Sequence, residues 1–138
     1  MNHLQSKTYS VLLDPGAAAT AVRTANLDTA GADAATILVP LGAELNTNST
    51  NVAIQFSESD TTVATTFATF NADFNRTIDN TAAVVSVNHI DLRGRKRYIR
   101  LTVTPDTTTN GVVLSSAVAI LDKEVRDTVK GSNAVVGN

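Results

Sequence analysis

Positively charged side chains gather in one short stretch of the sequence, DLRGRKRYIRLTVTPD, at positions 91–106. Five of the chain's eleven Lys and Arg residues lie there, within eight positions. A guanidinium group can bind a carboxylate or a phosphate through two parallel hydrogen bonds, so the cluster could contact an acidic protein surface or a nucleic acid. The candidate protein-contact residues are Arg93, Arg95, Lys96, Arg97, Tyr98 and Arg100.

A nucleic-acid site needs positive charge spread over a face, together with aromatic side chains that stack on bases. Tyr98 is the only aromatic residue near the cluster, and the formal net charge of the chain is −2. Arg and Tyr are enriched in the interfaces between proteins. We therefore expect no nucleic-acid partner. The solvated tip of a β-hairpin and a protein contact stay open as the two main interpretations.

Other reactive side chains do not form a catalytic or metal-binding pattern. His3 and His89 are 86 positions apart, neither has a second ligand at the spacing of a metal site, and the chain has no cysteine. We expect a backbone or Ser/Thr neighbour to satisfy His89 within a strand. Glu58 and Asp60, a close acidic pair, are more typical of a solvated loop than of an acid–base couple or a Ca²⁺ site. We predict no enzyme activity and no cofactor.

Length and composition indicate one folded domain. The chain has 138 residues, of which 43% are hydrophobic and 17% charged, and this is enough to build a core without disulfides or metals. No apolar run reaches the roughly 18 residues of a membrane span, and the N-terminus has no apolar signal core. We expect a protein that is made in the cytoplasm and that has no membrane partner.

Alternating apolar and polar residues predict a succession of strands. In 51–59, Val52, Ile54 and Phe56 share one side, and in 97–105 Ile99, Leu101 and Val103 do so, as in half-buried strands. The turn signals Asp14-Pro15-Gly16, Ala30-Gly31-Ala32-Asp33 and Arg93-Gly94 separate strands. Pro40 restricts its strand to a sheet edge or a bulge. The predicted strands cover 8–13, 35–45, 51–59, 81–92, 97–105 and 111–121.

One segment, 60–74, has helical spacing, with Val63, Phe67, Phe70 and Phe74 on one side. We predict a short helix here, started by an Asp60 cap and packed against one end of the domain, although its Thr content favours extended structure. Overall, we predict an all-β fold, an antiparallel β-sandwich of the jelly-roll type with extended termini.

The predicted domain organisation is simple. A single sandwich domain covers 1–121, with 1–7 as an N-terminal arm, and 122–138 forms a polar C-terminal arm that a neighbouring molecule would order.

Three blocks of the sequence resemble a family of small virion proteins of tailed bacteriophages. They are NLDTAGADAATILVPLGA (26–43), NVAIQFSESDTT (51–62) and IDLRGRKRYIRLTVTPDTTTNGVVLSSAVAIL (90–121), about two thirds of the chain. The most specific elements are Gly94–Arg100, Gly111–Val113 and Ala117–Ala119. The longer, Phe-containing 60–80 stretch and the extended C-terminus depart from the family pattern.

This resemblance implies a head decoration, or cement, protein that binds the assembled capsid and stabilises the junctions between capsomers. The implied partners are the major capsid protein and the protein itself, as a homotrimer suited to local threefold positions, and the implied location is the exterior of the capsid. The family has no catalytic residues. Arg93–Arg100 and the 122–138 arm are then the expected contact surfaces.

Two other functions stay open. The protein could be another virion subunit, such as a head–tail connector or a tail-associated protein, which would be present in far fewer copies. It could also be a carbohydrate-binding β-sandwich, which would need exposed aromatic residues as a platform for the sugar. The sequence offers only Tyr9, Tyr98 and a few Phe residues for that purpose.

Overall fold

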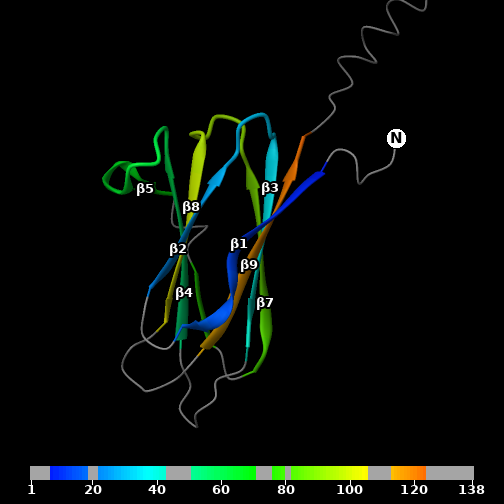
Figure 1. Ribbon diagram of the computed structural model, residues 1–138, viewed down its shortest axis with the longest axis vertical. Coiled ribbons are helices and arrows are strands. Elements are labelled where there is room, and N and C mark those ends of the chain that lie inside the picture. Colours follow the sequence, from blue (N-terminus) through cyan, green and yellow to red (C-terminus); the bar gives the residue numbers. More distant parts are fainter. Residues whose placement is uncertain are drawn as a thin grey trace, which may run out of the picture.

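The computed structural model describes residues 7–18, 22–42, 51–70, 76–79, 82–105 and 113–123. They form two antiparallel sheets that pack as two layers (Figure 1). The four-stranded sheet has the order β1 (Lys7–Ala18), β9 (Val113–Asp122), β3 (Ala34–Leu41), β7 (Val84–Asp91). The five-stranded sheet has the order β2 (Arg23–Asp28), β8 (Tyr98–Pro105), β4 (Asn51–Ser59), with β5 (Ala68–Thr69) and β6 (Arg76–Asp79) both pairing with β4.

The chain passes back and forth between the two layers. Strands β1, β3, β7 and β9 belong to one sheet, and β2, β4, β5, β6 and β8 belong to the other. Because β5 and β6 both lie beside β4, they share one strand position, and the order β1-β9-β3-β7 opposite β2-β8-β4-β5 is that of a jelly roll. The predicted all-β antiparallel sandwich is confirmed.

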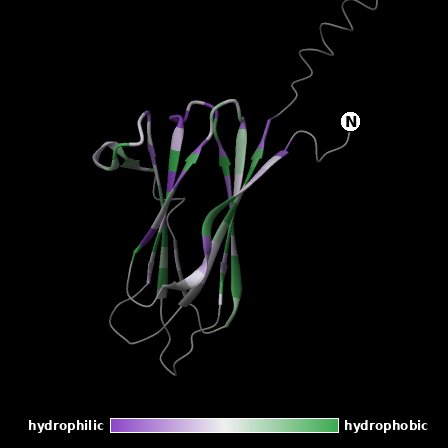
Figure 2. Ribbon diagram, in the orientation of Figure 1, coloured by the Kyte–Doolittle hydropathy of each residue, from purple (hydrophilic) through white to green (hydrophobic). Residues whose placement is uncertain are grey.

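The core lies between the sheets and consists of aliphatic side chains at every second position of the strands. In β4 and β8 these are the predicted residues, and all six are at most 1% exposed. Figure 2 shows hydrophobic residues along both layers and hydrophilic residues gathered at the upper end of the sandwich. The six residues are Val52, Ile54, Phe56, Ile99, Leu101 and Val103.

Asp14-Pro15-Gly16 is not the end of the first strand, as predicted, but an irregularity within β1. The register with β9 shifts between Val11 and Leu13 and again between Leu13 and Gly16, while the strand continues to Ala18. An edge strand can hold a proline and a bulge because only one of its sides pairs. The guanidinium of Arg23 from β2 stabilises this irregularity by donating a 2.6 Å hydrogen bond to the carbonyl of Asp14.

Pro40 also differs from the prediction, because β3 is an interior strand between β9 and β7. The proline lies one residue from the end of the strand, opposite Val85 of β7. The pairing of β3 with β9 is interrupted at Val39 and Pro40 and resumes at Leu41. Since proline has no N–H to donate, this local gap in one ladder is what allows it in an interior strand.

The predicted helix over 60–74 is wrong. In its described part, 60–70, the segment contains a single 3₁₀ turn, Ala64–Thr66, whose N-cap is Val63 without a side-chain cap, and then the short strand β5. Thr66 donates its hydroxyl to the Val63 carbonyl, and such competing bonds explain why a Thr-rich segment does not continue as a helix. Phe70 is buried against Phe56, as the packing prediction required, whereas Val63 is exposed. No helix in the described residues is long and apolar enough to span a membrane.

The strand position shared by β5 and β6 contains a register jump. Ser57 of β4 pairs with Thr69 of β5, and Ile54 pairs with Arg76 of β6. Three steps along β4 therefore correspond to seven steps along the other chain segment, a surplus of four residues. His3, Phe74 and the predicted arms (1–7, apart from Lys7, and 122–138, apart from Asp122 and Lys123) lie outside the described residues.

Candidate protein-contact surface

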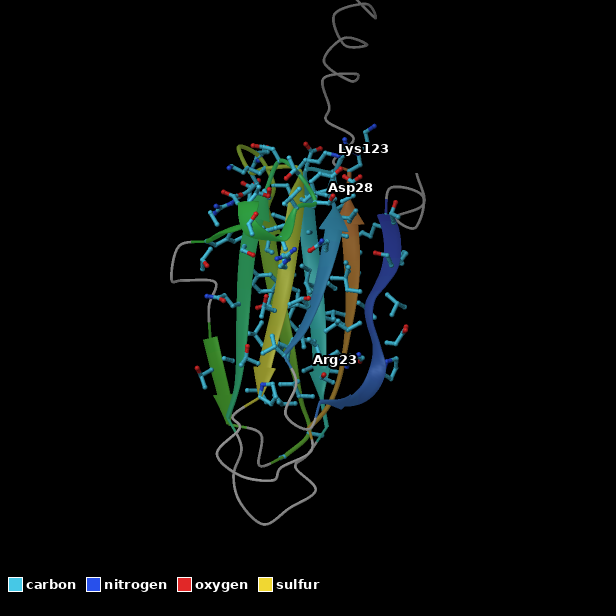
Figure 3. All side chains as sticks on the ribbon, turned by 60° about the vertical axis from the view of Figure 1, so that its left-hand side comes forward. Arg23, Asp28 and Lys123 are labelled. Carbon is cyan, nitrogen blue, oxygen red and sulfur yellow. The ribbon has the colours of Figure 1, made fainter. Side chains whose placement is uncertain are left out.

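The predicted contact residues lie at one end of the sandwich, in the β7–β8 loop and the start of β8. A turn closes this loop, in which Arg95 donates its backbone N–H to the Leu92 carbonyl at 3.0 Å. Gly94 takes a φ of 78° at the third turn position, a conformation that glycine adopts without strain. Asp28 and Lys123 lie at this same end, whereas Arg23 lies near the opposite one (Figure 3). The predicted Arg93-Gly94 turn is thus present.

Arg97 forms a two-pronged ion pair with Asp28, the last residue of β2. Its Nε donates to Oδ1 at 3.0 Å and its Nη2 to Oδ2 at 2.8 Å. The hydrogen bonds from the Arg97 guanidinium and from the Ala30 N–H lower the pKa of Asp28 to about 2, from an ordinary value of 3.8. The Asp28 carboxylate raises the pKa of Arg97 in turn. This pair connects the start of β8 to the end of β2.

Arg93 forms an equivalent pair within the loop. Its Nε and Nη2 donate to the two carboxylate oxygens of Asp91 at 2.9 and 2.7 Å. The side-chain and backbone hydrogen bonds from Arg93 lower the pKa of Asp91 to about 2. The Arg93 guanidinium is therefore held beside the end of β7, where the β7–β8 loop begins.

Arg95 and Lys96 contact the acidic pair at the end of β4, Glu58 within the strand and Asp60 just after it. Arg95 lies 3.7 Å from Glu58 and its guanidinium stacks 4.3 Å above the Phe70 ring. Lys96 donates its backbone N–H to Glu58 at 3.2 Å, and its ammonium lies 3.7 Å from Asp60. Asp60 thus faces a cation and does not cap a helix. The acidic pair supplies counter-charge to the basic cluster.

Arg100 lies on the outer face of β8 and connects three elements. Its Nε donates to the Asn26 side chain at 2.9 Å and its Nη1 to the Ala64 carbonyl at 3.2 Å. The guanidinium also lies 3.8 Å above the Phe67 ring, a cation–π geometry. Tyr98 is half-buried under the Arg97 guanidinium at 5.0 Å. Each predicted contact residue therefore has a partner within the same chain.

The positive charge of the cluster is largely compensated. Four of its five cations form ion pairs, with Asp91, Glu58, Asp60 and Asp28. Such a surface offers fixed, alternating charges, which suit recognition of a protein surface with a matching pattern better than attraction of a polyanion. Sequence reasoning identified the cations but missed Asp28, although the Glu58–Asp60 pair was visible in the sequence.

A second feature, which sequence reasoning did not identify, is the outer face of the four-stranded sheet. Val11, Val118, Leu38 and Val87 are direct cross-strand partners and form one row across all four strands. Val11 is 60% exposed and Val87 44%. The next row adds Tyr9, Ile120, Thr36 and His89. We name these eight residues the apolar face.

Strand β7 contributes to this face because its pattern is inverted. It buries Ser86 and Asn88 and exposes Val85 and Val87. Asn88 donates its amide Nδ2 to the Ile37 carbonyl at 3.2 Å and to the Ser86 hydroxyl at 3.1 Å. Its Oδ1 is buried and accepts no hydrogen bond from any described residue. A strand that hides polar groups and exposes valine is unusual for a monomer in water.

One hollow lies among the described residues at the upper end of β3, β7 and β9. It has a volume of about 520 Å³, is open, and lies beside Asp33, Asp91 and Asp122. No described group of His, Asp or Glu residues has the geometry of a metal site. His89 accepts or donates a 2.9 Å hydrogen bond with the Thr36 hydroxyl, as expected from the sequence.

The chain matches no known protein family model and no curated protein. The fold and its surfaces are therefore the basis for a functional proposal. They form a small jelly-roll domain with two exposed features: the cluster of largely ion-paired cations at Arg93–Arg100, and the apolar face.

Proposed function

We propose that the protein is a structural subunit of a tailed-bacteriophage virion, a decoration protein that binds the assembled head and stabilises the junctions between capsomers. The observation that carries the binding role is the apolar face, since valine, leucine and tyrosine side chains in rows across a sheet favour contact with another protein surface. The resemblance of the sequence to phage virion proteins supports the choice of assembly.

The segments that carry this resemblance fall on structural elements of the sandwich. Gly94–Arg100 forms the turn and the start of β8, and Ala117–Ala119 lies in the interior strand β9. Ala117 and Ala119 are fully buried, so this part of the motif serves packing between the sheets. Apart from the buried Ile99, Gly94–Arg100 is at the surface and supplies the contact with the capsid.

The stabilising mechanism is thermodynamic linkage, in which binding to the assembled lattice alone shifts the equilibrium toward the assembled state. A subunit that binds only the assembled lattice adds interface that must be lost before capsomers can separate. Modest affinity per copy is sufficient, because many copies act on one shell and oligomers engage several positions at once. A rigid domain suits this task, since little conformational entropy is lost when it binds.

The cluster at Arg93–Arg100 would contact the capsid through charges that are already oriented. The guanidinium groups of Arg93 and Arg97 remain about half exposed while bonded to Asp91 and Asp28. A capsid carboxylate can therefore approach the exposed side of the Arg97 group without reordering the side chain. Pre-organisation of this kind favours affinity by reducing the ordering cost.

The first test is the copy number of the protein in purified virions. A decoration protein approaches the copy number of the major capsid protein, and quantitative mass spectrometry of intact particles would measure the ratio. A ratio of about a dozen copies per particle would identify a connector or tail subunit and overturn the decoration role. Absence from mature particles would overturn the virion assignment.

The second test separates contact from folding. The variant Arg95→Ser, Arg97→Ser, Arg100→Ser should lose binding to heads that lack the native protein, measured by co-sedimentation. The control variant Asp28→Asn, Glu58→Gln disrupts the same internal ion pairs but keeps the cations, so it should weaken binding much less than the Ser variant, through the ordering cost alone. Unchanged binding of the Ser variant would contradict the assignment of the contact surface.

A further inference from the structure

Strand β7 forms an open edge of the four-stranded sheet in the described part of the molecule. β7 pairs with β3 on one side, and no described strand pairs with its other side. Along an edge strand, every second residue directs its N–H and C=O groups away from the sheet. Such a row of unpaired groups is a template for another strand unless the sequence protects it.

The other three sheet edges carry such protection. β1 is bent by two register shifts and contains Pro15. β2 has six residues and carries Arg23 and Asp28 at its ends. β5 and β6 have two and four residues and are out of register with one another. Prolines, bulges, charges and short strands are the devices by which proteins block the pairing of edges.

β7 carries a single charge, Asp91 at its end, and no other such device. It has eight residues in unbroken register with β3, from Val84 opposite Leu41 to Asp91 opposite Ala34. Between Val84 and Ile90 it contains no Pro, Asp, Glu, Lys or Arg. Val84, Val85, Val87 and Ile90 have high β propensity, and the three valines are exposed.

We propose that the β7 edge pairs antiparallel with the β7 edge of a second copy of this chain, about a two-fold axis. The two four-stranded sheets then become one sheet of eight strands with a continuous apolar face. A second copy is the occupant because the outward row of β7 matches itself: its exposed valines can meet the same valines across a two-fold axis, and no other described edge offers an unbroken strand of this length with so little charge. A heterologous ring, such as the expected trimer, would need β7 to pair with one of the protected edges.

The alternation of β7 restricts the register of this pairing. Direct partners in an antiparallel pair share a face, so outward residues must lie opposite outward residues. With Val87 opposite Val87 of the second copy, Val85 lies opposite His89 and Ser86 opposite Asn88. No like charges meet in this arrangement.

The mass of the full chain in solution tests the proposal directly. Analytical ultracentrifugation over a micromolar concentration series should show an increase from the monomer mass of 14.5 kDa to twice that value. A monomer at every concentration, or a trimer, would overturn the proposal. Because no virion component takes part, the result is independent of the decoration role.

Cysteine variants test the register. Directly opposite Cα atoms in an antiparallel pair are about 4.5–5.5 Å apart, a distance that a disulfide spans. The native chain has no cysteine, so mild oxidation of Val87→Cys should give a covalent dimer on a non-reducing gel. Val85→Cys, which faces His89 in this register, should remain largely monomeric. Equal cross-linking of both variants, or none for Val87→Cys, would contradict the register.

Charge variants separate the edge from the face. Val87→Lys places like charges opposite one another and should weaken dimerisation about tenfold. Val11→Lys, at a position that is more exposed (60% against 44%) but on the distant edge strand β1, should not. A mixture of Val87→Lys and Val87→Glu should restore dimers. Loss of dimers in Val11→Lys alone would assign the contact to the face and refute the edge pairing, and circular dichroism would check folding.

Discussion

Strands β7 and β8 are neighbours in the chain, have eight residues each and both alternate, yet they face the core in opposite ways. β8 buries Leu101 and directs Arg100 outward, whereas β7 buries Asn88 and exposes Val87. In β8 the apolar side chains point into the core. In β7 polar side chains point into the core and valines point outward, which favours contacts outside the monomer. Alternation alone therefore does not identify the buried side of a strand.

Position in the sandwich explains why the inversion is tolerated. β8 lies between β2 and β4, where polar side chains would find few partners among aliphatic ones. β7 lies at the edge of its sheet, where Asn88 reaches the carbonyl of Ile37 and the hydroxyl of Ser86. The two bonds use the donors of the Asn88 amide, so the cost that remains comes from Oδ1, which accepts no bond from a described residue.

The largest expected difference between the strands comes from shortening one side chain in each. Leu101→Ala should reduce the free energy of unfolding by about 3 kcal/mol, through lost transfer energy and a cavity. Val87→Ala should change it by less than about 0.5 kcal/mol, because the side chain is exposed. Denaturant unfolding at a concentration that keeps the protein monomeric measures both. Equal losses would mean that the exposed side of β7 packs within the monomer.

A smaller effect is expected at the buried amide of β7. Asn88→Asp replaces the donor to the Ile37 carbonyl with an acceptor and should reduce stability by about 2 kcal/mol at pH 7. Burial raises the pKa of the new carboxyl above its unfolded value of roughly 4, so the loss grows as the pH rises through the two pKa values. Unfolding curves from pH 3 to pH 7 measure this trend. A loss that did not depend on pH would show that the carboxyl is solvated, and Asn88→Ser is the uncharged control.

The smallest effect is expected at the exposed start of β8. Arg97→Gln removes the hydrogen bonds that lower the pKa of Asp28, so this pKa should rise from about 2 towards 3.8. Because the folded pKa is lowered, the pair stabilises the native chain above about pH 4, and that contribution is lost as the pH falls through 2. NMR titration of the Asp28 carboxyl measures the shift. Arg93→Gln, which affects Asp91, should leave Asp28 unchanged.

The sequence predicted the fold class and the strands in which pattern and core agree. The alternating residues of 51–59 and 97–105 are buried as expected, because each of these strands has one face on the core. The Asp14-Pro15-Gly16 signal failed because a guanidinium from another strand stabilises the irregularity, a contact between distant segments. The predicted helix over 60–74 was wrong because the prediction relied on the helical spacing of apolar residues. In the molecule the Thr hydroxyls form local hydrogen bonds that compete with a helix.

The candidate site was also predictable only in part, because some of its contacts are local in the sequence and others join distant segments. The cations follow one another in the sequence, so their clustering is evident. Their partners come from the ends of β2 and β4, and only the jelly-roll topology brings Asp28 and Glu58 to them. The apolar face was not predictable from β7, where the period of two is clear but the choice of buried side depends on packing.

The register jump between β5 and β6 has a practical consequence for engineering. The ladders on both sides of the four surplus residues remain paired with β4, so the sheet already accommodates extra length at this place. A short epitope inserted between Phe70 and Arg76 would change no strand of the other layer. If many copies coat a particle, that single insertion would convert the particle into a multivalent display scaffold.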